Sequence, residues 1–182
     1  KEEKYSLSFS DLKQAMGIKS NFNKVEAYDV SHISGDHAVA SCIVFSEQGP
    51  RKKEYRLFNI PKSLSGNDVG SLEHVLSRRI KSYEDESIKP SLILIDGGKN
   101  QLKYSQSVIS NSIHKDIKVI SIVKGTNRIR ATETILSSDG VIQLDKYSKA
   151  YLLLQEMRDE SHRFAITAQR KKKLGGTKKS QL

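Results

Sequence analysis

A short run of large aliphatic residues that ends on an aspartate and two glycines constrains the fold of this chain more than any other stretch. Residues 92–95 read LILI, follow Pro90 and stop at Asp96, with Gly97 and Gly98 next. Four apolar residues are too few for an independent helix, so they predict a strand buried on both faces. In open α/β sheets, ligands bind at the carboxyl edge of such strands. Asp96 also has a simpler interpretation, because such aspartates often serve turns or cap helices.

The other apolar patterns predict a mixed sheet flanked by helices. β-Branched and alternating stretches predict strands over residues 25–30, 38–45, 51–60, 92–95 and 118–123, with a hairpin over 131–144. Apolar residues at helical spacing predict helices over residues 68–80, about 99–110 and 147 to about 170. Short links between the first three strands favour an antiparallel meander. This order resembles the ribonuclease H fold: an α/β mixed sheet flanked by helices, here with an extra hairpin and a long C-terminal helix.

We expect one folded domain over residues 24–170. Residues 1–23 are polar with a weak helical pattern at 10–16, and we interpret them as an N-terminal segment that packs on the domain surface. Residues 171–182 are lysine-rich, and we interpret them as a disordered basic linker toward a further module. Because the chain begins on Lys1 rather than methionine, we expect it to be an excised fragment.

The net charge of +10 favours a polyanionic partner such as nucleic acid, although high charge also serves solubility in general. Cys42 is the one cysteine, which excludes an internal disulfide and a cysteine-rich zinc site. A lone cysteine fits a reducing compartment, and we expect a cytoplasmic protein. No apolar run approaches membrane-spanning length, so we expect no membrane association.

A second aspartate, Asp29, ends the first predicted strand as Asp96 ends the fourth. In the predicted topology these strands are parallel neighbours, so the two carboxylates lie side by side. Close carboxylates repel each other unless a cation lies between them, and oxygen-only ligands favour Mg²⁺ or Mn²⁺. Such an ion can activate water for attack on a phosphodiester. The pair therefore predicts phosphodiester hydrolysis, which agrees with the basic charge.

The last predicted helix carries His162, one turn beyond Arg158 and on the same face. Histidine can transfer a proton near neutral pH, or bind an ion as neutral imidazole. A lone helical histidine is nevertheless more often a surface residue, and composition does not select this one. The chain also contains His32, His37, His74 and His114.

Four motifs together resemble the UvrC family, the endonuclease subunits of bacterial nucleotide excision repair. They are YDVSHISG at 28–35, LIDGGK at 94–99, VKG at 123–125 and RDESHRFAI at 158–166. Their order and approximate spacing match the C-terminal nuclease domain of that family, over about residues 25–170. The DGG motif alone would be weak, whereas four collinear motifs are specific.

The resemblance implies a ribonuclease H-like domain that cuts the damaged DNA strand on the 5′ side of a lesion. The family's two catalytic aspartates and its histidine fall on Asp29, Asp96 and His162. A further acidic residue of the family falls on Asp68, for which helix capping is the alternative. The implied partners are damaged double-stranded DNA and a UvrB–DNA complex, reached through modules outside this segment. We expect the segment itself to be monomeric.

Basic residues near the motifs are candidates for contacts with phosphates beside the scissile bond. They are Arg78, Arg79, Lys99, Lys124, Arg158 and Arg163. Two other functions stay open at this point: a nucleic-acid-binding module whose carboxylates are structural, and a ribonuclease H-like nuclease related to endonuclease V. The first needs no metal, and the second would cut near deaminated bases. Neither requires the RDESHRF run, which favours the excision-repair endonuclease.

Overall fold

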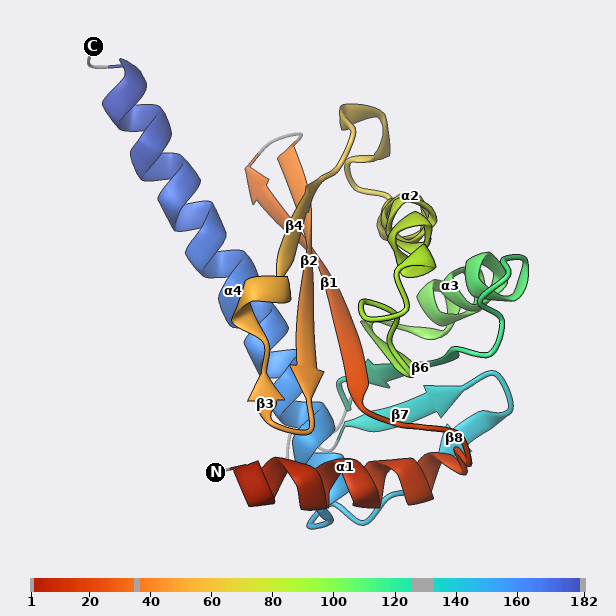
Figure 1. The fold of residues 1–182 in the computed structure, drawn as a ribbon. Coiled ribbons are helices and arrows are strands. Elements are labelled where there is room, and N and C mark those ends of the chain that lie inside the picture. Colours follow the sequence, from red (N-terminus) through yellow and green to blue (C-terminus); the bar gives the residue numbers. More distant parts are fainter. Residues whose placement is uncertain (1, 35–36, 126–132, 181–182) are drawn as a thin grey trace.

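The computed structural model describes residues 2–34, 37–125 and 133–180, whose helices and strands Figure 1 shows. The helices are α1 (Glu2–Met16), α2 (Asp68–Arg79), α3 (Lys99–Ser110) and α4 (Lys149–Ser180). The strands are β1 (Lys24–Ser34), β2 (His37–Ser46), β3 (Gly49–Pro50), β4 (Arg56–Asn59), β5 (Leu92–Asp96), β6 (Lys118–Val123), β7 (Thr134–Ser137) and β8 (Gly140–Ile142). Short 3-10 helices, Lys52–Glu54, Lys62–Leu64 and Ile80–Glu84, lie in the connections.

Within these ranges the strands form one mixed sheet in the order β3-β2-β1-β5-β6-β7-β8, and β4 also pairs with β2. β1 pairs antiparallel with β2 and parallel with β5, and β5 pairs parallel with β6. The aliphatic, β-branched sequences of these central strands suit a position covered on both faces. The predicted ribonuclease H-like sheet is confirmed, and the β7–β8 hairpin extends it beyond β6.

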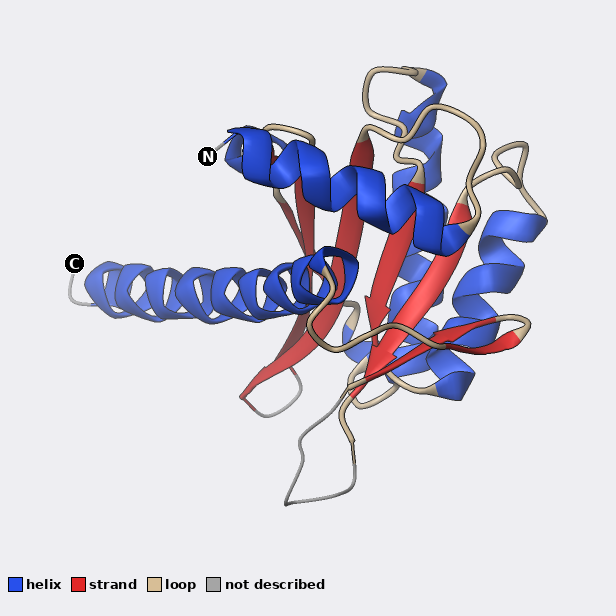
Figure 2. Ribbon diagram, turned by 90° about the horizontal axis from the view of Figure 1, so that it is seen from below, coloured by secondary structure: helices blue, strands red, loops and turns tan. Residues whose placement is uncertain are grey.

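Helices cover both faces of the sheet, and Figure 2 shows α1 and α4 crossing one of them. Val25 and Ala27 of β1 pack in the core on the α1 and α4 side. Tyr28 of the same strand packs in the core on the α2 and α3 side. Because side chains alternate along a strand, this pattern decides which β1 residues can meet α4, the helix that carries His162.

Two predicted elements differ from the structure. The strand predicted over 51–60 is a 3-10 helix followed by the short β4, because the charged residues of Lys52–Glu54 have no apolar partners to alternate with. α4 continues as a helix to Ser180, where we expected a disordered linker. Lysine and arginine favour helix, whereas Gly175 and Gly176 within the extension disfavour it. Residues 131 and 132 of the predicted hairpin lie outside the described residues.

The N-terminal helix contributes to the core. α1 begins at Glu2, well before the predicted start at residue 10, and buries Phe9, Leu12 and Met16 beside the sheet and α4. The Asp11 carboxylate accepts a hydrogen bond from the backbone N–H of Ala150 at 2.9 Å, in the first turn of α4. Within the described residues, no helix combines the length and apolar content needed to cross a bilayer.

The burial of α1 leads to a prediction about stability. Leu12→Ala removes a fully buried side chain and should lower the free energy of unfolding by about 2–5 kcal/mol, measured by urea denaturation. Leu7→Ala is the matched control on the same helix, because Leu7 is half exposed. It should change stability by less than about 0.5 kcal/mol. Equal effects of the two substitutions would show that α1 is only a surface attachment.

Candidate active site

Asp29 and Asp96 occupy neighbouring positions at the carboxyl edge of β1 and β5. The parallel register of the two strands runs up to the residues just before them. Ala27 and Leu94, two positions earlier on each strand, belong to the core on the α4 side. By strand alternation the two carboxylates share that face. The structure thus brings together the two aspartates that the topology predicted to be neighbours.

Burial and mutual repulsion disfavour ionisation of these two groups. Asp29 is 8% exposed. Burial first, and then the charge of Asp96, raise the pKa of Asp29 to about 6, while a contact with His162 opposes the rise. Burial also raises the pKa of Asp96, and the cations Arg158 and Lys124 oppose that rise. The edge therefore holds two carboxylates whose negative charges are only partly balanced.

α4 brings His162 to the same carboxylates. Its Nδ1 lies 3.5 Å from Oδ2 of Asp29, and the imidazole is 62% exposed. The hydroxyl of Ser31 donates to the same carboxylate oxygen at 3.4 Å. The ring therefore has one nitrogen beside a buried carboxylate and most of its surface open to solvent.

Arg158 is held in place by carboxylates on both sides. Its guanidinium contacts Glu133 and lies 2.8 Å from the Asp159 carboxylate. The Glu133 side chain is 6% exposed, and its Oε2 has no hydrogen-bond partner among the described residues. The Tyr151 hydroxyl bonds both the N–H and the C=O of Glu133, at 2.8 and 3.1 Å. Sequence reasoning missed Glu133 because it lies outside every motif.

The other basic residues predicted to contact DNA lie in different parts of the fold. Lys99 and Lys124 follow β5 and β6 at the same carboxyl edge and are exposed. Arg78 is exposed on α2. Arg163 is exposed on α4 and makes an ion pair with Glu160.

The prediction that Arg79 contacts DNA is wrong. Its guanidinium is buried and donates to Glu26 through Nε at 3.2 Å and Nη2 at 2.7 Å. The Tyr28 hydroxyl donates to the same carboxylate at 2.7 Å, and the Tyr83 hydroxyl donates to it as well. Arg79 lies three residues after the buried Leu76, so both occupy the core-facing side of α2.

Asp68 stands on the opposite face of the sheet. Its Oδ1 lies 3.0 Å from Nε2 of His32. By strand alternation, His32 points to the face of the sheet opposite α4. The capping alternative is wrong, because Asn67 caps α2 by accepting from the N–H of Gly70 at 2.9 Å. A functional role for Asp68 stays a prediction.

The donor chemistry at the carboxyl edge fits a hard divalent cation. Asp29 and Asp96 supply carboxylate oxygens, the ligands that Mg²⁺ and Mn²⁺ prefer. Both carboxyl groups have raised pKa values, so a cation between them would offset their repulsion. Within the described ranges no three His, Cys, Asp or Glu side chains converge as a preformed site. Water and substrate oxygens would complete the coordination of such an ion.

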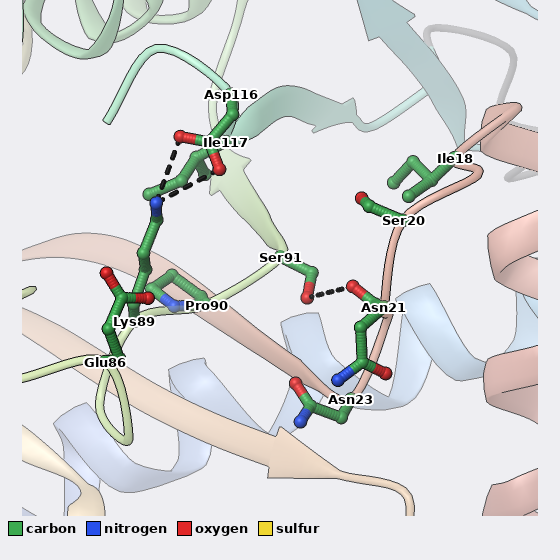
Figure 3. Close-up of a pocket in the computed structure, with 10 residues that line it drawn as sticks. All are labelled: Ile18, Ser20, Asn21, Asn23, Glu86, Lys89, Pro90, Ser91, Asp116 and Ile117. Carbon is green, nitrogen blue, oxygen red and sulfur yellow. Dashed lines mark hydrogen bonds and ion pairs between the residues drawn. The ribbon is translucent and has the colours of Figure 1, made fainter. Parts of the chain in front are cut away.

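A separate polar pocket of about 250 Å³ lies at the amino edge of the sheet (Figure 3). Its residues come from the segments before β1, β5 and β6. The Lys89–Asp116 ion pair at 3.0 Å and a hydrogen bond of 3.2 Å from Ser91 Oγ to Asn21 O cross it. Because the predicted site residues lie at the other edge, this pocket is not part of the candidate active site.

A ribonuclease H-like sheet whose carboxyl edge joins two aspartates to a helical histidine defines a nuclease-type domain. A protein-family model described as the UvrC RNase H endonuclease domain matches residues 13–166. The chain belongs to this family.

Relatives of known name agree with this assignment. The UvrABC system protein C of Legionella pneumophila (strain Paris) is 39% identical over 167 residues, which cover 91% of the chain and 27% of the relative. The protein of that name from Nitrosococcus oceani is 40% identical over 176 residues, which cover 96% of this chain and 29% of the relative. The chain therefore spans less than a third of the length of these curated relatives.

A solved structure of human endonuclease V is similar in fold. It superposes with a TM-score of 0.50 and 14% sequence identity, covering 82% of this chain and 87% of that one. At this identity the likeness concerns the fold alone, and it supports the ribonuclease H-like sheet.

The raised pKa of Asp29 predicts a pH dependence of stability in protein kept free of divalent cations. A carboxyl group with a raised folded-state pKa favours the fold below its unfolded pKa of about 3.9, and this contribution is lost as the pH rises toward about 6. Asp29→Asn should remove the loss and raise stability at pH 7 by roughly 1–3 kcal/mol. Denaturation with urea between pH 4 and 7 measures both effects. The control is Asp139→Asn, in the exposed β7–β8 turn, and a matching gain there would contradict the prediction.

Proposed function

We propose that this chain is a metal-dependent endonuclease domain that hydrolyses a phosphodiester bond on the 5′ side of a lesion in nucleotide excision repair. The observation that carries the proposal is the position of Asp29 and Asp96 at one sheet edge, with His162 Nδ1 3.5 Å from the first. Membership of the UvrC endonuclease-domain family supplies the repair context. A binding module with structural carboxylates gives no reason to bury two repelling charges together.

Asp29 and Asp96 would hold Mg²⁺ or Mn²⁺. When bound, such an ion supplies an activated water and stabilises the charge that develops on the phosphate. The two aspartates would hold the ion at the open edge of the sheet, and the reacting phosphate would bind to the ion rather than to the carboxylates. Asp29 is the more buried of the two.

His162 would act as the proton-transfer group. If Nδ1–H points toward Asp29 Oδ2, the tautomer leaves Nε2 as the free acceptor. The open face of the ring allows Nε2 to take a proton from the attacking water, or to return it to the leaving oxygen. Asp29 thereby orients the imidazole and stabilises its charged form.

Cations around this edge would bind the DNA backbone. Lys124 and Arg158 already act on Asp96, and their charges suit the oxygens of the reacting phosphate. Contacts farther along the strand would come from Lys99, Arg78 and Arg163. Asp68 would serve as an additional acidic group near the DNA, with His32 as its partner.

The biological setting completes the proposal. The substrate would be damaged double-stranded DNA, presented as a complex with UvrB through parts of the longer protein. The domain itself would be monomeric, and it would act in the cytoplasm.

Metal binding and strand cutting test the two roles of the site separately. Asp29→Asn and Asp96→Asn should each weaken Mn²⁺ binding at least tenfold, measured by calorimetry, and abolish nicking of DNA. His162→Asp should keep Mn²⁺ binding and lose about 10²–10⁴-fold in nicking rate, because a carboxylate is a poor proton donor at neutral pH.

Two results would change this assignment. Recovered cutting by His162→Asp would make the histidine a metal ligand instead. Unchanged Mn²⁺ affinity in both aspartate variants, with Asp139→Asn as the surface control, would remove the proposed metal site altogether.

The DNA contact of Lys124 is testable by salt titration. Lys124→Gln should reduce the slope of log K against log salt by about 0.9, as expected for one lost phosphate contact on duplex DNA. Lys115→Gln is the matched control, because Lys115 is exposed before β6, at the amino edge of the sheet. Equal slopes for Lys124→Gln and the unsubstituted protein would place the DNA path elsewhere.

A further inference from the structure

A pair of buried serines joins α4 to the sheet beside the candidate active site. The Ser41 and Ser161 hydroxyl oxygens lie 2.9 Å apart, and Ser41 Oγ also lies 3.1 Å from the backbone carbonyl oxygen of Ser161. Both residues are at most 1% exposed. The two hydroxyl protons satisfy both bonds if Ser161 donates to Ser41 and Ser41 donates to the carbonyl. The contact is thus fully satisfied and closed to water.

The position of this contact connects it to the catalytic residues. Ser41 of β2 is paired with Asp29 of β1 in the antiparallel register. Ser161 directly precedes His162 on α4. One short path therefore links the strand position opposite Asp29 to the residue next to His162.

The apolar contacts of α4 fix which face of the helix is buried, because Leu154, Met157 and Ala165 are completely buried. Hydrophobic contact has no preferred direction, however, so it resists small rotations and shifts of the helix less well than a directional hydrogen bond does. His162 is mostly exposed, so its own packing does not fix its position.

Two other polar contacts of α4 lead away from the site. The Tyr5 hydroxyl of α1 donates to Glu156 at 3.0 Å, and the Tyr55 hydroxyl, just before β4, donates to Glu160 at 2.9 Å. These bonds tie α4 to the periphery of the fold. The serine pair ties it to β2, the strand beside Asp29.

We propose that Ser41 and Ser161 are positioning residues that set the rotation and height of α4, and thereby hold the His162 imidazole against Asp29. The inference rests on the proposed function, since it assigns the serines to the same site. A misplacement of about 1 Å can cost on the order of 10²-fold in rate, so a contact that fixes helix register has a direct catalytic effect.

Paramagnetic relaxation by Mn²⁺ provides the test, because it reports the distance from the His162 ring to an ion held by the aspartates. In the unsubstituted domain, Mn²⁺ should strongly broaden the ring-proton NMR signals of His162. Ser41→Ala and Ser161→Ala should each reduce this broadening at least twofold and leave Mn²⁺ affinity unchanged. The double variant should behave like either single one, since each substitution breaks the same contact.

Ser105→Ala is the matched control. Ser105 is also fully buried, on α3, but its hydroxyl has no partner among the described residues, so its removal should not alter the broadening. Circular dichroism verifies the fold of each variant, and the two serines lie on separate elements, so either single variant can decide the question.

The outcomes separate the two proposals. Broadening in the serine variants equal to that of the unsubstituted domain would overturn the positioning role and leave the proposed function intact. Absence of Mn²⁺ binding by the unsubstituted domain would overturn the proposed function, and the positioning role with it.

Discussion

The parallel pairing of β1 with β5 creates the interaction on which the site depends, the repulsion between Asp29 and Asp96. Parallel strands end at the same edge, so two carboxylates that terminate them become neighbours without any loop having to place them. Burial under α4 strengthens the repulsion, because charges are poorly solvated there. The surrounding cations offset part of it, with Arg158 and Lys124 acting on Asp96. A fold that keeps such a pair retains an unfavourable contact, which is typical of sites that bind a ligand.

The two edges of the sheet have different characters. At the carboxyl edge, the exposed imidazole of His162 and two exposed lysines lie around the buried Asp29, which suits a long polyanion that cannot enter a cavity. At the amino edge, the residues that line the pocket around Ser91 are joined to one another by an ion pair and a hydrogen bond. The proposed site is thus an open edge of the sheet rather than a cavity.

The sequence was sufficient where the spacing of apolar residues and the place of a residue at a strand end carry the information. The runs at 92–95 and 118–123 became β5 and β6, and parallel topology then made Asp29 and Asp96 neighbours. It failed where a side chain's partner is distant in sequence. Helical spacing from Leu76 places Arg79 on the core-facing side of α2, but its partner, the buried Glu26 of β1, cannot be found from the local sequence. The contact of Arg158 with Glu133 and the bond between Ser41 and Ser161 likewise join residues whose proximity exists only after folding.

The length of α4 has a mechanical consequence. Residues 166–168 are half-buried, Arg170 and Lys171 are exposed, and the backbone continues as helix to Ser180, so the last part of α4 projects from the body of the protein (Figure 2). Such a rod resists twisting and bending, and it contains His162 close to where it leaves the body of the protein. A torque applied near Ser180 would therefore reach the imidazole as a rotation about the helix axis.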